Sequence, residues 1–395
     1  MALYFTRRAL VSGGVAAAGA ATFPWPAAAQ LPLPKSPVSL NLIDATGNLA
    51  LTQKIIENYR AANPKLVSRI TFTKAPQPEL PGKIRAQQNA GRVDIDLALA
   101  SYDGLTGGLA QNVWLRLFPE QSDSLPNLEE IFLPGAWKIQ QQTNGFGLVM
   151  NYSPYGVVLE YMPSRLKNVP HTADELMAWC KENKNRFIYA RPANSGPGRA
   201  LMTALPYILN DSNPADPANG WSKTWEYLKE LGQYIEYYPS GTSSVFKEFG
   251  DGSRDMLPST LGWDINPRVL GIVPKEAKTT TLQGFHWVSD AHCWCVPKGV
   301  SNEKLAVIFD LMRFALRPEQ QAYTYDEGYF YPGPAVKGAT LDMAPEESRK
   351  AILEYGRPEY AELIEKIPHE LPLSPEANQA AFRIWDEQVG GAKKG

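Results

Sequence analysis

Cysteine is scarce in this sequence, with three residues in 395. So few cysteines exclude a fold built on disulfides, and the odd number leaves at least one thiol unpaired. Cys293 and Cys295 are two positions apart in an expected strand, where their side chains share a face but lie too far apart to bridge easily. We interpret both as small core residues.

Catalytic and metal-binding patterns are also missing. No Gly-x-Ser-x-Gly elbow occurs, and the histidines show no metal-ligand spacing; they are His171, His286, His292 and His369. We therefore expect no catalytic residues, no cofactor and no metal. A thiolate formed by Cys293 or Cys295 near His286 and His292 is the alternative that would make the protein an enzyme.

Charge of one sign is not in excess either. The formal net charge is −2 and no long basic block occurs, which argues against nucleic acid as a partner. Beyond the first thirty residues, no apolar stretch is long enough to cross a membrane. Hydrophobic residues make up 44% of the chain, enough for two folded domains with large cores.

Residues 1–29 have the composition of an export signal. Arg7 and Arg8 precede an uncharged run from Val11 to Phe23, and small residues follow up to Ala29. The paired arginines resemble the twin-arginine class of signals, which directs export across the bacterial inner membrane. We expect cleavage near Ala29 and a periplasmic protein; the alternative is a retained membrane anchor.

Strand and helix patterns alternate along the rest of the chain, which predicts an α/β fold with mostly parallel sheets flanked by helices. In the first half, strands are expected at Val38–Leu42, Ile70–Phe72, Ile95–Ala100 and Gly145–Met150, with helices around Leu51–Tyr59 and Ile84. In the second half, we expect strands at Phe187–Ala190, Tyr234–Tyr238, Met256–Leu261 and Cys293–Val296, and helices around Leu176, Gly198–Leu209, Trp221–Leu231 and Glu303–Leu316.

Four segments, taken in order, resemble one protein family. They are Tyr59–Pro64 after the first helix, Val93–Ser101, Gly145–Tyr152, and Val296–Asn302 with the helix that ends at Arg317-Pro318-Glu319. They resemble the extracellular solute-binding proteins of bacterial ABC importers, in the branch that includes spermidine/putrescine-binding proteins. Each pattern is loose by itself, and their order and spacing carry the resemblance.

The resemblance implies two α/β lobes of the periplasmic-binding-protein fold, type II-like, joined by crossing segments that act as a hinge. Residues 36–150 and 291–395 would form lobe 1, and residues 151–290 would form lobe 2. It also implies a small-molecule solute gripped between the lobes, delivery to an ABC permease in the inner membrane, and no chemistry on the solute. We expect a monomer.

Polar residues that follow expected strands of lobe 1 are candidates for binding the solute, since ligands in α/β folds lie beyond the carboxyl ends of strands. Thr46 and Asn48 stand at a helix start with backbone N–H groups to offer. The alternative is an ordinary helix cap. Tyr102 and Asp103 offer an aromatic face and a carboxylate, although Asp103 could instead only cap the next helix. Asn151 follows the strand that leads into lobe 2.

The loop Arg191–Arg199 is the most suggestive stretch of lobe 2. Ser195 and Gly196 precede a helix, and Arg199 adds positive charge near its start, so a carboxylate, phosphonate or sulfonate could bind here. The loop lacks the lysine of a nucleotide-binding P-loop. The alternative is a plain connection between a strand and a helix.

Further candidates come from the later part of lobe 2 and from the return to lobe 1. They combine aromatic faces with ionisable groups and comprise Trp263, Asp264, Trp287, Asp290, His292 and Tyr331. We assign Trp294 to the core.

Asp290 and His292 occupy the places, seven and five residues before Pro297, where polyamine-binding relatives have an aromatic residue and an acid. With Arg199 nearby, this departure favours a small polar or anionic solute over a polyamine. A polyamine-binding protein, a secreted enzyme on the same fold, and a sensor or chaperone subunit stay open as alternatives.

Overall fold

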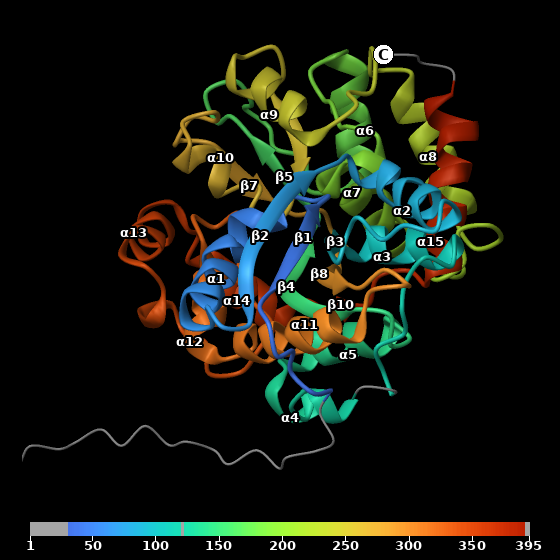
Figure 1. Cartoon of the computed structure of the whole chain (residues 1–395). Coiled ribbons are helices and arrows are strands. Elements are labelled where there is room, and N and C mark those ends of the chain that lie inside the picture. Colours follow the sequence, from blue (N-terminus) through green and yellow to red (C-terminus); the bar gives the residue numbers. More distant parts are fainter. Residues whose placement is uncertain (1–30, 120–121, 392–395) are drawn as a thin grey trace, which may run out of the picture.

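Two β-sheets organise the chain, and each is the centre of one lobe (Figure 1). Residues 31–119 and 122–391 are described by the structure, a computed structural model; the expected export signal lies outside them. We call the part around the seven-stranded sheet lobe 1 and the part around the three-stranded sheet lobe 2. The expected two-lobed α/β fold is confirmed, whereas the exact lobe boundaries stay a prediction.

The large sheet has the order β2-β1-β3-β8-β4-β9, with β10 paired to β8. Its strands are β1 (Val38–Asp44), β2 (Val67–Lys74), β3 (Leu97–Ser101), β4 (Leu148–Gly156), β8 (Trp287–Cys295), β9 (Gly333–Pro334) and β10 (His369–Glu370). β1 runs parallel to β2 and β3, but β8 runs antiparallel to both β3 and β4.

The small sheet has the order β6-β5-β7, and both of its ladders are antiparallel. Its strands are β5 (Val158–Tyr161), β6 (Met256–Ser259) and β7 (Lys278–Thr280). This differs from the mostly parallel sheets that we expect. β5 enters lobe 2 directly from β4, and the later strands β6 and β7 both run beside it in the opposite direction.

Helices cover both sheets. Their bounds in the first half of the chain are α1 (Asn48–Ala62), α2 (Leu80–Asn89), α3 (Tyr102–Ala110), α4 (Leu128–Ile131), α5 (Pro134–Gln142), α6 (Ala173–Glu182) and α7 (Gly196–Ile208). In the second half they are α8 (Ser222–Gly232), α9 (Thr242–Gly250), α10 (Asn266–Val269), α11 (Asn302–Ala315), α12 (Pro318–Gln321), α13 (Glu346–Tyr355), α14 (Glu359–Lys366) and α15 (Pro375–Trp385). In Figure 1, α6–α10 gather around the small sheet, whereas α1, α5 and α11 lie against the large one. Among the described residues, no helix is both long and apolar enough to span a bilayer.

Two expected strands are wrong. Tyr234–Tyr238 forms no strand, and Phe187–Ala190 contributes only an isolated bridge from Phe187 to Met256. Both segments are apolar because they pack in the core, where Tyr189 and Tyr238 surround Trp385. A short apolar run has the same pattern in a strand and in a buried irregular segment, so periodicity alone cannot separate the two.

The C-terminal helix α15 joins elements of both lobes. It packs against α3 of lobe 1, as Figure 1 also shows, while Trp385 at its end is buried in the lobe 2 core. The Trp385 ring lies 4.9 Å from Tyr238 and 6.1 Å from Tyr189, and its Nε1 donates to the Tyr189 hydroxyl at 3.2 Å. The end of α15 is thus part of the lobe 2 core.

We expect Trp385→Ala to lower the free energy of unfolding by about 3–5 kcal/mol, because it leaves a large cavity and removes aromatic contacts. Urea unfolding followed by circular dichroism measures this. The control is Leu353→Ala, at a side chain that is 80% exposed, which should change the stability by less than about 0.5 kcal/mol. Equal effects of the two substitutions would contradict the assignment of Trp385 to the core.

Candidate functional site

The two lobes meet along a surface lined by the ends of strands and the starts of helices. We call this surface the lobe interface and define it by Thr46 and Asn48 of lobe 1 at α1, Tyr102 and Asp103 at α3, Arg199 of lobe 2 at α7, Asn151 and Tyr155 on β4, and Asp290 and His292 on β8. Most of the predicted binding residues therefore lie close together, although they come from distant parts of the sequence.

Arg199 is the charged centre of the lobe interface. Its Nη1 lies 2.6 Å from Asp103 Oδ2 on lobe 1, and its Nη2 lies 2.6 Å from Asp290 Oδ2 on β8. The guanidinium also covers the Tyr155 ring, with 5.2 Å between Cζ and the ring centroid. Burial by itself would lower the pKa of Arg199, but the two carboxylates raise it well above its ordinary value. The positive charge that we expect to bind an anion is therefore already neutralised here.

The start of α7 is likewise satisfied within the protein. Ser195 is the N-cap, and its Oγ accepts hydrogen bonds from the Gly198 backbone N–H at 3.2 Å and from Thr242 Oγ1 at 2.8 Å. A Cβ on Gly196 would lie 2.1 Å from the Tyr155 hydroxyl, so glycine at this position lets Tyr155 approach the helix. Ser195 and Gly196 thus position α7 and Tyr155 in the present arrangement.

The start of α1 is capped by a residue that is not among the predicted site residues. Asp44 Oδ1 accepts the backbone N–H groups of Thr46 at 3.1 Å and Asn48 at 3.0 Å, and its Oδ2 accepts that of Leu49 at 3.3 Å. The backbone donors at this helix start are therefore engaged by a carboxylate. Asp44 thus forms an ordinary helix cap, which is the alternative to a solute-binding helix start.

A buried polar network joins both crossing strands to α1. Asn48 Nδ2 donates to Asn151 Oδ1 at 2.7 Å and lies 3.1 Å from His292 Nδ1, while Trp294 Nε1 donates to Asn48 Oδ1 at 3.2 Å. The His292 ring stacks on Phe330 with 4.3 Å between centroids. Burial, assisted by the charge of Arg199, lowers the pKa of His292 to about 3, so this imidazole is neutral at physiological pH.

The segment Tyr329–Tyr331 lies between the lobes. The Tyr329 hydroxyl donates to the Thr46 carbonyl at 3.1 Å, and its ring packs edge-on against Trp263 of lobe 2 at 5.6 Å. Ser153 Oγ on β4 donates to the Tyr331 carbonyl at 2.6 Å. Gly262 adopts φ +104°, and a Cβ there would lie 2.4 Å from the Tyr329 carbonyl oxygen. Glycine is therefore required where this segment approaches lobe 2.

Two of the predicted residues have complete sets of partners elsewhere in the structure. Trp287 is fully buried in the core, where its Nε1 donates to the Leu363 carbonyl at 3.0 Å. Asp264 is also fully buried and binds Arg357 Nε at 2.6 Å and the Tyr360 hydroxyl at 2.7 Å. The polar groups of Trp287 and Asp264 are therefore engaged within the protein, and we do not assign either residue to solute binding.

Several buried polar atoms near the lobe interface have no hydrogen-bond partner. Each belongs to a residue on β4 or to one that closely follows the end of another strand. The atoms are Thr46 Oγ1, Tyr102 Oη, Asn151 Nδ2, Tyr155 Oη and Thr260 Oγ1. Buried polar groups are normally paired, so a cluster of exceptions needs a cause. The Tyr155 hydroxyl is close enough to the Arg199 guanidinium for the two groups to influence each other's pKa, but it does not meet the angular criteria of a hydrogen bond. Donors and acceptors placed in this way suit a polar molecule entering between the lobes.

The lobe interface is closed in this structure. The cavity beside Arg199 measures only about 10 Å³ and is lined by residues that include Tyr155, Ser289, Pro372 and Asn378. Such a space admits at most one water molecule. An organic solute can reach these groups only if the lobes separate.

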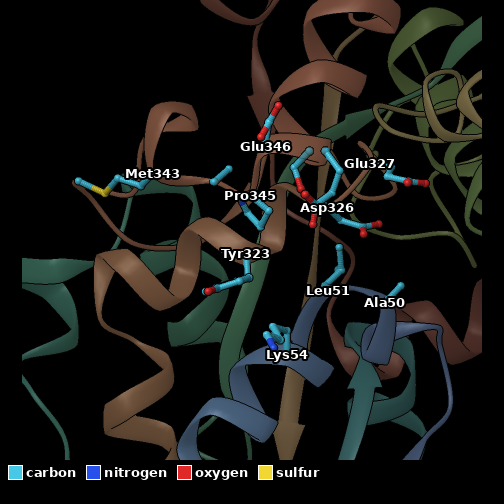
Figure 2. A pocket seen from close by; sticks show the side chains of 12 residues that line it. Ala50, Leu51, Lys54, Tyr323, Asp326, Glu327, Met343, Pro345 and Glu346 are labelled. Carbon is cyan, nitrogen blue, oxygen red and sulfur yellow. The ribbon is translucent and has the colours of Figure 1, made fainter.

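A larger cavity of about 570 Å³ lies outside the lobe interface, between α1 and α13 (Figure 2). Figure 2 shows Lys54 of α1 and Glu346 of α13 on opposite sides of it, with Asp326 between them. None of the predicted site residues lines it, and Lys54, Met343 and Glu346 are exposed. Its size suits a small molecule, but its lining includes none of the unpaired buried polar atoms.

Sequence reasoning missed Tyr155 and Asn378. Tyr155 is on the crossing strand only four residues after Asn151, and that spacing in β4 could have pointed to it. Asn378 Nδ2 donates to Asp103 Oδ1 at 2.8 Å, and no local pattern separates it from other helix residues.

Within residues 31–119 and 122–391, no cluster of three or more His, Cys, Asp or Glu side chains has the arrangement of a metal site. All three cysteines are buried and unbridged.

One family model matches most of the chain. The family model described as "Bacterial extracellular solute-binding protein" matches residues 54–352. No curated protein matches the sequence significantly.

Solved structures give the same fold at low sequence identity. An ABC transporter protein from Clostridium perfringens matches with a TM-score of 0.63 at 15% identity, covering 89% of this chain and 99% of that one. A spermidine/putrescine substrate-binding protein from Streptococcus pneumoniae matches with a TM-score of 0.59 at 14% identity, covering 88% and 98%. A periplasmic thiamin-binding protein matches with a TM-score of 0.61 at 15% identity, covering 90% and 99%.

A second buried acid, Glu160, lies close to Asp264, Arg268 and Arg357. Glu160 on β5 is fully buried, and its carboxylate lies next to the Ser259 hydroxyl without well-formed hydrogen-bond geometry. Burial, and secondly the Asp264 carboxylate, raise the pKa of Glu160 to about 8, although Arg357 and Arg268 act in the opposite direction. The folded protein therefore keeps this carboxyl group protonated over a pH range in which the unfolded chain does not.

Because the folded-state pKa of Glu160 is raised, its contribution favours folding below about pH 4.5 and is lost as the pH rises towards 8. Glu160→Gln keeps the shape and cannot ionise. We expect it to leave the stability unchanged at pH 4.5 and to increase it by about 2–4 kcal/mol at pH 8, measured by urea unfolding at both pH values. Glu230→Gln, at an exposed ion pair with Lys181, should give no such pH-dependent gain. An equal effect of Glu160→Gln at both pH values would contradict the raised pKa.

Proposed function

The chain belongs to the family of bacterial extracellular solute-binding proteins, and on this premise we propose that it is the exported, periplasmic receptor of an ABC importer. It captures a small polar organic solute between its lobes and delivers it to a permease in the inner membrane. The binding set comprises Thr46, Asn48, Tyr102, Asp103, Asn151, Tyr155, Arg199, Asp290 and His292, with Trp263 and Tyr331 at its edge.

The observation that carries this proposal is the cluster of unpaired, buried polar atoms at the lobe interface. Their desolvation is unfavourable in the closed protein without a solute. A polar solute that supplies the missing partners would stabilise a closed form that encloses it, by its higher affinity for that form than for the open one. Solutes named for similar structures include spermidine or putrescine, thiamin and fructose-6-phosphate, so the fold by itself does not select one.

An enzyme is less well supported. Burial raises the pKa of Cys293 well above its ordinary value and also raises that of Cys295, which disfavours a reactive thiolate. The neighbouring His292 is part of the network with Asn48. Reversible binding without chemistry on the solute accounts for the buried polar groups more simply.

Thermal unfolding of the exported protein with a panel of polar solutes tests the function, because a solute that binds only the folded state raises the melting temperature. The panel includes sugars, amino acids, organic acids, phosphonates and polyamines. A saturable rise in melting temperature with one class supports reversible capture. Chemical conversion of the bound molecule, or no rise with any class, would contradict it.

Tyr155→Phe tests the site, since it removes a hydroxyl that has no partner in the free protein. We expect the stability without solute to be unchanged or slightly higher, and the affinity for the solute to fall about tenfold, the value of one good hydrogen bond. Isothermal titration measures the affinity. The control is Tyr234→Phe, a half-buried tyrosine outside the lobe interface, which should leave the affinity unchanged. Full affinity in Tyr155→Phe would remove Tyr155 from the binding set.

Export through the twin-arginine route is tested by Arg7→Lys together with Arg8→Lys, which keeps the charge but removes the paired arginines. We expect the doubly substituted protein to stay in the cytoplasm as an uncleaved precursor, detected by cell fractionation and mass spectrometry. Arg60→Lys serves as the matched control and should be exported normally. Normal export of the double variant would point to a different route.

A further inference from the structure

We infer that the solute is a zwitterion whose cationic group binds Asp103 of lobe 1 and whose anionic group binds Arg199 of lobe 2. The inference rests on the proposed function and specifies the solute class of that site. The bound solute would replace the direct ion pair that now connects the two lobes.

The first argument is that each partner of the Asp103–Arg199 pair is also held by a second residue: Asp103 by Asn378 of α15, and Arg199 by Asp290 of the crossing strand β8. Asp103 Oδ1 accepts a hydrogen bond from Asn378 Nδ2 at 2.8 Å, and only Oδ2 reaches Arg199. Arg199 Nη2 is bound by Asp290 Oδ2, whose other oxygen accepts the Ala291 backbone N–H at 2.8 Å. One oxygen and one nitrogen are thus left to meet across the lobe interface. When the lobes separate, these two groups of opposite charge become available together.

The second argument is charge compensation. Both side chains are largely buried while the lobes are closed, and opening the lobes would leave Asp103 facing Arg199 across a gap, so closure without a cation and an anion in that gap must restore the direct ion pair. A solute with only an anionic group could bind Arg199, but it would leave Asp103 without a cation and would be repelled by Asp103 and Asp290. A solute with only a cationic group could bind Asp103, but the nearby positive charge of Arg199 would repel it. A zwitterion gives an alternating row of charges, in which every buried charge has an opposite neighbour.

The third argument is that hydrogen-bonding groups without partners accompany the charges. Tyr155, under the guanidinium, has a buried hydroxyl without a partner, and so does Tyr102, next to Asp103 in the sequence. The Tyr155 hydroxyl can donate to an anionic group held by Arg199. The charges of both Asp103 and Arg199 act on the Tyr102 hydroxyl, which can donate to or accept from a polar solute between them.

The experiment sorts the solute panel by charge. Every zwitterion is accompanied by the amine that lacks its carboxylate and the acid that lacks its ammonium group; 4-aminobutanoate, butylamine and butanoate form one such set. We expect the largest rise in melting temperature from a zwitterion, and affinities at least about tenfold weaker for its two single-charge relatives. If an amine, a polyamine, an acid or a neutral solute binds best, the inference is wrong while the proposed function stands. If no class binds, the proposed function itself fails.

Asp103→Asn provides an independent test. It leaves Arg199 paired with Asp290 alone, so no charge is left without a partner and we expect the variant to fold. The affinity for the zwitterion should fall at least about tenfold, whereas the acid-only relative should bind more tightly than it binds the unmodified protein, because a repulsive carboxylate is gone. Asp386→Asn removes the same charge from the Arg191 ion pair outside the lobe interface and should change neither affinity.

An unchanged preference for the zwitterion in Asp103→Asn would overturn the inference. The comparison of matched solutes on the unmodified protein decides the question even if Asp103→Asn fails to fold.

Discussion

The antiparallel pairing of β4 with β8 is the constraint on which the arrangement of the molecule depends. The two strands run side by side from the large sheet towards lobe 2, with Asn151 opposite His292 and Ser153 opposite Asp290. Side chains alternate along a strand, so this register brings the amide of Asn151, the imidazole of His292 and the carboxylate of Asp290 to the place where the lobes meet. A shift of one residue would direct them to the other face and would also change how the lobes are joined.

Charge at the lobe interface is balanced within the protein. Two carboxylates flank one guanidinium, and burial raises the pKa of Asp290 to about 6 despite the neighbouring Arg199. Arg199 Nη1 and Asp103 Oδ2 are in direct contact at 2.6 Å. The two residues belong to different lobes, which we propose to separate when a solute enters. A buried ion pair contributes little net stability compared with apolar packing, but breaking it without a replacement is unfavourable. Such a pair suits a contact that is exchanged for contacts with a solute.

The lobes are also connected by Tyr329 and by the C-terminal helix α15, to which we assign no role in solute binding. Tyr329 bridges Thr46 and Trp263, and Trp385 fixes the C-terminal helix in the lobe 2 core while the same helix packs on α3. Opening must leave the large apolar contacts of Trp385 intact, because their loss would expose much of the core. The proposed movement would therefore have to take place in β4, β8 and the segment around Tyr329, which connect the two sheets.

The sequence by itself determined the α/β class, most helices, the core cysteines and the stretches that carry polar residues after strands, because these depend on local periodicity and on short-range capping. It also indicated the family through the order of four loose patterns. Only the tertiary structure decided that Arg199 is neutralised by Asp103 and Asp290, that Asp264 and Trp287 have their partners elsewhere, that Tyr155 lies in the lobe interface and that Asn378 binds Asp103. These facts depend on contacts between residues up to 275 positions apart. Such contacts are set by strand register and lobe packing, and no local pattern encodes them.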